Sequence, residues 1–138
     1  MVLRRPGVSY RQAVEEVMQL LSGQWVAAVL AALALGPLHF SEVLHEVNAV
    51  EEELGWRTHT RPLSGKVLAR TLDRMERDGL VNRYETRVAS GRSVCYELTH
   101  TGQSLLAVLR PVAQWVQTYQ AEQRAADDRS RPNLGNGA

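Results

Sequence analysis

The spacing of apolar residues changes once from a helical to an alternating pattern, directly after Gly79. Before Gly79, apolar residues recur at steps of three and four in successive segments, which is the spacing of a buried helix face. After it, residues 81–88 and 94–98 alternate around the turn-forming stretch 89–92, which predicts a β-hairpin. Helical spacing then returns and continues to about Arg124. A chain with this order is predicted to be mainly α with a small β-hairpin.

Serine and glycine residues mark where the predicted helices begin and end. Ser41 and Ser64 are suited to capping a helix N-terminus, and Gly55 and Gly79 to following a helix C-terminus. The acidic run 51–53 is interpreted as the solvent-facing end of the third helix. The first four helices are predicted over residues 10–21, 24–34, 41–55 and 65–78.

Length and composition fit one globular domain. The chain has 138 residues, 44% of them hydrophobic, which is enough for one core. We predict a flexible arm over residues 1–9, one domain over 10–125 and a disordered tail over 126–138. The longest apolar stretch, Trp25–Leu35, is about half as long as a membrane span, so no membrane partner is expected.

Side chains that carry metal, redox or catalytic chemistry are sparse in this sequence. Cys95 is the only cysteine, which excludes an intramolecular disulfide and a cysteine-based zinc site. The four histidines lack metal-ligand spacing, and no phosphate-binding glycine loop or nucleophile elbow is present. We therefore expect no metal, no cofactor and no enzymatic activity. The single cysteine favours the reducing cytoplasm.

A basic block lies in the middle of an almost neutral chain. Residues 57–92 hold nine basic and four acidic residues, whereas residues 11–55 hold one arginine and seven acidic residues. The formal net charge of the whole chain is only +1. A concentrated positive segment is typical of a surface that binds a polyanion, although a solvated basic face has the same composition.

The predicted helix after Ser64 has an apolar face and a cationic face. Leu68, Leu72 and Met75 lie within about 60° of one another on a helical wheel. The second helix of a helix-turn-helix pair enters the DNA major groove, and a hairpin after it flanks the groove as a wing. We therefore predict a winged helix-turn-helix with double-stranded DNA as its partner. The predicted DNA contacts are Arg61, Ser64, Lys66, Arg70, Asp73, Arg74, Arg77, Arg83, Arg87 and Arg92.

The predicted contacts differ in kind. The helix residues after Ser64 are expected to face base edges, whereas Ser64 and the N–H groups beside it suit a phosphate. Arg92, at the hairpin tip, is expected to reach the adjacent minor groove. Arg83 and Arg87 are expected to approach the DNA backbone.

Five segments, in order, resemble motifs of the HxlR-type family of bacterial winged-helix regulators, within the broader MarR-like group. They are Gly23-Gln24-Trp25, Gly36-Pro37-Leu38-His39-Phe40-Ser41-Glu42, Ser64-Gly65-Lys66-Val67-Leu68, Arg77-Asp78-Gly79-Leu80-Val81, and Tyr96-Glu97-Leu98-Thr99 with Gly102. The similarity covers about residues 12–118. It implies a dimeric transcription factor that binds an inverted-repeat operator.

The chain departs from that family in two places. The stretch Asn48–Pro62 is about ten residues longer than the usual link before the recognition helix. Well-known members sense quinones or aldehydes through a cysteine close to the N-terminus, and this chain has no cysteine before Cys95. The phase of Cys95 in its predicted strand places it outside the main core, with Arg83 or Arg87 across the hairpin. We interpret it as a residue without a redox role.

The last predicted helix has more apolar surface than one core can cover. A helix folded back on its own core is the alternative to a homodimer, which we favour, in which symmetry-related helices pack together. The residues predicted at the dimer interface are Tyr10, Val14, Val17, Leu105, Leu109, Val112, Val116 and Tyr119.

Large aromatic side chains predict a further partner, a small aromatic or apolar effector. Trp25, Trp56, Trp115 and Tyr119 are expected to line its cavity. Alternatively, Trp56 only covers the end of the third helix. A rival hypothesis keeps the fold and assigns sequestration of a small molecule, or resistance to it. The basic helix face favours a DNA-binding regulator, more as a repressor than as an activator.

Overall fold

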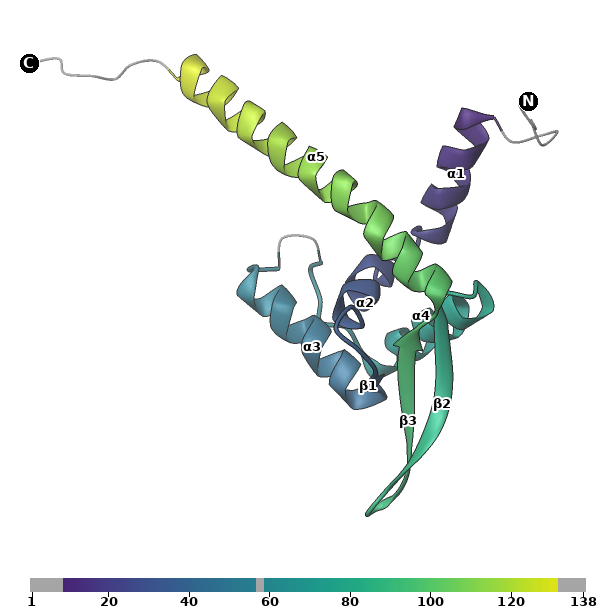
Figure 1. Cartoon of the computed structure of the whole chain (residues 1–138). Coiled ribbons are helices and arrows are strands. Elements are labelled where there is room, and N and C mark those ends of the chain that lie inside the picture. Colours follow the sequence, from purple (N-terminus) through teal and green to yellow (C-terminus); the bar gives the residue numbers. More distant parts are fainter. Residues whose placement is uncertain (1–8, 57–58, 132–138) are drawn as a thin grey trace, which may run out of the picture. The chain divides into compact units, whose positions relative to one another are not determined.

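The computed structural model describes residues 9–56 and 59–131 (Figure 1). The chain forms two compact units, residues 1–103 and 104–138. In chain order the elements are α1 (Tyr10–Leu20), α2 (Val26–Ala32), β1 (Leu38–His39), α3 (Phe40–Glu53), α4 (Gly65–Arg77), β2 (Val81–Val88), β3 (Gly91–Leu98) and α5 (His100–Ser130). This order confirms the predicted class, mainly helical with a small antiparallel sheet. Within the described residues, no helix is both long enough and apolar enough to cross a membrane.

The core of the first unit is built from one stripe of each central helix. The predicted α4 stripe is confirmed, since Leu68, Leu72 and Met75 are buried. Val43 and Val47 bury the corresponding face of α3. The buried residues of α2 are Val26, Val29 and Leu30. These three helices pack around one core because each presents apolar residues at helical spacing.

The ends of α4 follow directly from its sequence. The Ser64 hydroxyl accepts a hydrogen bond from the Val67 N–H at 3.2 Å, so Ser64 is the N-cap as predicted. At the other end, Gly79 has φ 76°, and the Leu80 N–H donates to the Met75 carbonyl at 2.9 Å. This arrangement is a Schellman motif, which stops the helix and leads into β2.

The limits of α3 confirm one prediction and correct two. The helix ends before Gly55, as predicted, and Gly55 has φ 73°. It begins earlier than expected, because the N-cap is His39, two residues before Ser41, and the His39 N–H donates to Glu42 Oε1 at 2.9 Å. The acidic run does not simply face solvent, because Glu51 is only 5% exposed.

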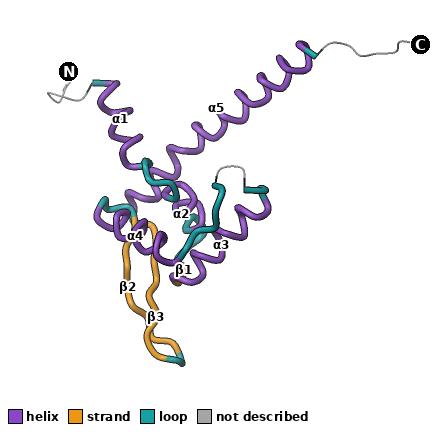
Figure 2. The backbone as a smooth tube through the Cα atoms, turned by 180° about the vertical axis from the view of Figure 1, so that it is seen from behind, coloured by secondary structure: helices purple, strands orange, loops and turns teal. Residues whose placement is uncertain are grey.

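The hairpin is confirmed, and it belongs to a sheet with a third strand that the sequence analysis missed. The strand order is β1-β3-β2, all antiparallel. Strand β1 has two residues, Leu38 opposite Tyr96 and His39 opposite Cys95. Figure 2 shows that β2 and β3 extend beyond the helices of the first unit as a two-stranded wing. Residues 89–90 form its tip.

Helix α5 starts against the end of the sheet and runs further than predicted. The Thr99 hydroxyl accepts from the Gly102 N–H and donates to the Gly79 carbonyl, which fixes the first turn. Gly102 has no room for a side chain, because an added Cβ would meet the Leu80 carbonyl oxygen. The helix continues to Ser130, so the first part of the predicted tail is helical. Residues 132–138, and most of the predicted 1–9 arm, lie outside the described residues.

Candidate nucleic-acid interface

Helix α4 has one buried face and one exposed, charged face. Its sequence holds four basic and two acidic residues, and none of these six charged side chains is buried. Lys66 and Arg70 lie on the first turns of the exposed face and have no ion-pair partner among residues 9–56 and 59–131. These two cations are therefore available to a ligand outside the chain.

Asp73 and Arg77 form a pair on the same face. Arg77 Nη2 lies 3.5 Å from Asp73 Oδ2, and both side chains are mostly exposed. An exposed ion pair of this kind is worth little in water, so either group exchanges partners readily. The pair places an acceptor and a donor side by side toward the last turn of α4.

Arg74 does not belong to the exposed face, which corrects its assignment to the DNA contacts. Its Nη2 donates to the Gln19 carbonyl at 2.7 Å and to the Ser22 hydroxyl at 2.9 Å, and its Nε lies 3.7 Å from Asp78. The guanidinium therefore bonds the C-terminal end of α1, where the helix dipole is negative. Arg74 lies about 80° from Lys66 on the helical wheel, which turns it toward α1.

The connector before α4 is fastened to α3 by one side chain that the sequence analysis did not single out. Asn48 Oδ1 accepts from the Leu63 N–H at 2.8 Å, and Asn48 Nδ2 donates to the Leu63 carbonyl at 3.0 Å. Leu63 is buried directly before Ser64, whereas Arg61 is exposed. Asn48 therefore fixes the position at which α4 begins. An asparagine on a helix face gives no sequence signal for this role.

The wing carries two arginines directly opposite each other. Arg87 on β2 pairs in register with Arg92 on β3, next to the tip. Like charges at opposed strand positions destabilise a sheet unless an anion lies between or near them. Arg92 is 75% exposed, and its Nη1 lies 3.5 Å from Glu85, which offsets only part of the repulsion. This end of the wing therefore suits a phosphate.

A hollow between α4 and the wing brings three predicted contacts together. Its volume is about 360 Å³, and Arg70 from α4 and Arg83 from β2 both line it. Asp73 and Glu76 line it too, so its charges balance. The helix face and the base of the wing form one continuous surface.

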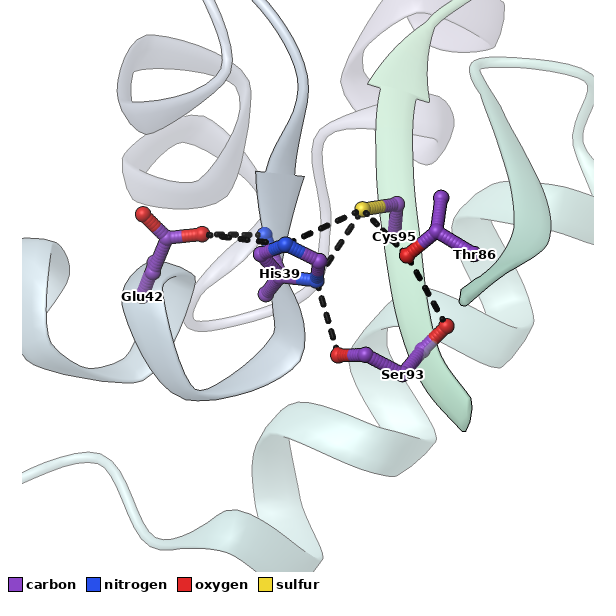
Figure 3. Close-up of polar contacts among 5 residues, drawn as sticks. All are labelled: His39, Glu42, Thr86, Ser93 and Cys95. Carbon is purple, nitrogen blue, oxygen red and sulfur yellow. Dashed lines mark hydrogen bonds and ion pairs between the residues drawn. The ribbon is translucent and has the colours of Figure 1, made fainter. Parts of the chain in front are cut away.

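Cys95 is buried, which corrects the expectation that it lies outside the core. Figure 3 shows it on β3 facing His39, and the thiol lies 3.1 Å from His39 Nδ1. The residue opposite it on β2 is Tyr84, not an arginine. Desolvation, and then the nearby Cys95 and Glu97, raise the pKa of the Tyr84 phenol above its ordinary value.

The polar cluster around His39 ties β1 to β3. His39 Nδ1 lies 2.8 Å from the Ser93 hydroxyl as well as beside the Cys95 thiol (Figure 3). Thr86 from β2 lies 3.9 Å from the same sulfur. These contacts explain why residues 38–39 form strand β1. Two residues are too few to show the alternation that predicts a strand from sequence.

The four aromatic residues predicted to line an effector cavity do not line the cavity between α2 and α3. Trp25 is buried, with its ring stacked on His59 at a centroid distance of 3.7 Å. His59 in turn lies 2.9 Å from Glu51. Trp115 stacks on Tyr119 along α5.

Comparison with known proteins decides the family. A sequence model described as HxlR-like helix-turn-helix matches residues 20–124, most of the chain. The chain belongs to the HxlR-like helix-turn-helix family. It is a transcriptional regulator with a helix-turn-helix fold, as the sequence resemblance implied.

The curated relatives are HTH-type transcriptional regulators of similar length. An HTH-type transcriptional regulator of Methanothermobacter thermautotrophicus is 27% identical over 121 residues, which cover 88% of this chain and 82% of the relative. The HTH-type transcriptional regulator YvaP of Bacillus subtilis is 29% identical over 101 residues, 73% of this chain and 81% of YvaP.

Solved structures show the same fold. A MarR-family transcriptional regulator of Enterococcus faecalis V583 superposes with a TM-score of 0.70 at 20% identity, covering 88% of this chain and 98% of that one. The reduced form of the transcriptional regulator YodB of B. subtilis gives 0.59 at 24% identity, covering 81% and 94%. In this HxlR-like fold, α3 and α4 are the helix-turn-helix pair and β2–β3 is the wing.

Proposed function

We propose that this HxlR-like protein is a cytoplasmic homodimer that binds an inverted-repeat DNA operator and represses transcription. In this proposal α4 enters the major groove, where Lys66 and Arg70 bond guanine edges and Arg77 assists. Ser64 and Arg61 bond phosphates at the start of the helix. Arg87 and Arg92 bring the wing tip to the neighbouring backbone and minor groove, and Arg83 lies beside the helix. No step of this function requires a catalytic group.

One observation carries the proposal. Lys66 and Arg70 are exposed, have no ion-pair partner within the described part of the chain, and lie on a helix whose opposite face is buried. A positive face on a helix that the core holds in place is preorganised for DNA, since little backbone freedom remains to be lost on binding. The same face argues against sequestration as the only role, because a sequestering module needs no basic recognition helix.

Dimerisation is proposed from the apolar residues that both terminal helices leave exposed. Tyr10 on α1 is 88% exposed, and Trp115 on α5 is 65% exposed. Val14 on α1, and Val112, Val116 and Tyr119 on α5, are exposed as well. Surfaces of this kind are stabilised by a second copy, whose two-fold symmetry matches an inverted repeat. Light scattering should give about twice the 15.4 kDa of one chain.

In this proposal, repression results from occupancy of the operator by the dimer. A dimer that covers an operator overlapping a promoter excludes polymerase without any further contact surface. Its half-sites would be about 34–36 Å apart, one turn of DNA, or a multiple of that spacing.

Gel-shift assays across the DNA upstream of the chain's own gene test the proposal. The full-length protein is expected to shift one fragment at a concentration that leaves unrelated DNA free. A Lys66→Ala/Arg70→Ala variant should lose that shift, and Glu52→Ala, an exposed change on α3, should retain it. Equal binding of the double variant and the wild-type protein would refute the assigned DNA face.

A further inference from the structure

A cavity of about 390 Å³ lies between α2 and α3, away from the exposed face of α4. Four alanines of α2 form one wall, namely Ala27, Ala28, Ala31 and Ala32. Val47, Val50 and Leu54 form the apolar part of the facing wall. The hollow exists because alanine side chains are too short to fill the space opposite the larger residues of α3. Its size and apolar walls suit a small organic molecule.

Among the described residues that line this cavity, glutamates outnumber the single basic residue, His59. Helix α3 carries five glutamates and no lysine or arginine, and α2 carries no charged residue. Glu46 and Glu51 both line the cavity. Glu51 is buried and already bonded to His59, whereas Glu46 is exposed. The cavity also lies along the C-terminal half of α3, where the helix dipole is negative.

We propose that the cavity between α2 and α3 binds a lipophilic organic cation, with its apolar body against the α2 alanines and its positive head beside Glu46. An anion is disfavoured by the glutamates and the helix terminus. A neutral molecule gains the apolar contacts alone. A cation gains both, so charge complementarity selects it.

Binding at this site has a direct route to the DNA-binding helix. Asn48, on α3 beside the cavity-lining Val47, holds the backbone of Leu63 immediately before the N-cap of α4. A molecule that separates α3 from α2 therefore shifts the start of α4. This regulatory step rests on the proposed function, whereas the binding step does not.

Three probes that share a phenyl ring and a three-carbon chain test the binding step. They are 3-phenylpropylamine, 3-phenylpropanol and 3-phenylpropionate, which carry a positive, a neutral and a negative head. Calorimetric titration of the full chain without DNA should give the affinity order amine, alcohol, carboxylate. A carboxylate that binds as tightly as the amine, or an amine that gives no saturable heat, would overturn the proposal.

Matched variants locate the site. Ala31→Leu fills the cavity and should weaken amine binding about tenfold or more. Ala34→Leu, three residues further along and outside the cavity, should not. Glu46→Gln should lower amine affinity about two- to fivefold and leave alcohol affinity unchanged. Unchanged amine binding by Ala31→Leu would place the amine elsewhere and overturn the assignment.

Two controls separate misfolding and rival occupants from loss of the site. If Ala31→Leu melts below the wild-type protein, Ala27→Leu, one helical turn earlier on the same exposed wall, replaces it. If Ala31→Leu changes the mass in light scattering while no probe binds the wild-type protein, a second copy of the chain occupies the groove and the proposal is wrong.

Operator affinity measured with and without the amine tests the regulatory step. The amine should weaken operator binding by the wild-type protein and not by Ala31→Leu. Binding of the amine with unchanged operator affinity would overturn the coupling and leave the site standing. Failure to bind DNA in the absence of any probe would instead refute the proposed function.

Discussion

The two helices of the helix-turn-helix pair are built alike and differ in where their charges lie. Helices α3 and α4 have 14 and 13 residues, each buries an apolar stripe, and each is followed by a glycine with positive φ. Helix α3 carries five glutamates, one of them buried, whereas α4 carries four basic residues, none buried. Apolar spacing therefore explains how both helices pack. The sign and burial of the charges explain why only α4 suits a polyanion.

The largest expected effect concerns the buried charge of α3. Glu51→Ala removes the carboxylate that meets His59 in the core and should lower the free energy of unfolding by about 3–5 kcal/mol. Glu52→Ala, at the next and exposed position, should change it by less than about 0.5 kcal/mol. Urea denaturation followed by circular dichroism measures both. Equal losses would show that the burial of Glu51 is not what distinguishes it.

Urea denaturation should also distinguish the two faces of α4 by how much a substitution on each face lowers the free energy of unfolding. Leu72→Ala opens a cavity in the core and should cost about 2–5 kcal/mol of stability. Lys66→Ala, on the opposite face, should change stability by less than about 0.5 kcal/mol. A destabilised Lys66→Ala protein would mean that this face holds the fold rather than a ligand.

Arg70→Ala should weaken specific operator binding by about 1–3 kcal/mol if the side chain reads a guanine. The loss should disappear on an operator in which the contacted base pair is changed, because no hydrogen bond then remains to be lost. Fluorescence anisotropy with a panel of base-substituted duplexes measures this. Uniform weakening on every duplex would instead assign Arg70 to the backbone.

The smallest expected effects distinguish the arginine of the wing from the arginine that joins α4 to α1. Arg92→Ala should lower the salt slope of DNA binding by about one phosphate contact, with no loss of stability because the repulsion from Arg87 is removed. Arg74→Ala should cost about 1 kcal/mol of stability, because the Gln19 carbonyl and the Ser22 hydroxyl each lose one hydrogen bond, and should leave the salt slope unchanged. A lower salt slope for Arg74→Ala, together with an unchanged salt slope for Arg92→Ala, would instead assign Arg74 to the DNA contacts.

The parts of this fold that could be predicted from the sequence are those set by local signals, namely helix caps and the alternation of the wing strands. Ser64, Gly55 and Gly79 act within one turn of their own positions, and the wing strands follow from alternation. Features that depend on distant partners were missed. Strand β1 exists because β3 pairs with it, and His59 stacks on a tryptophan from another element.

In the candidate site too, local features could be predicted from the sequence, whereas features that depend on distant partners could not. The helical wheel identified the exposed face of α4 but not the destination of Arg74, because a side chain at the edge of a stripe is directed by whichever element packs beside it. The two hydrogen bonds between Asn48 and Leu63 join residues 15 positions apart, and no periodic pattern in the sequence indicates them.

The salt dependence of operator binding tests the central claim most directly. If the face of Lys66 and Arg70 docks on DNA, log Kobs should fall linearly with log salt concentration, by about 0.9 per phosphate neutralised. The Lys66→Ala/Arg70→Ala protein should retain native stability and bind the operator no better than unrelated DNA. A flat salt response by the wild-type protein, or undiminished operator specificity in the double variant, would contradict the assignment of this face to DNA.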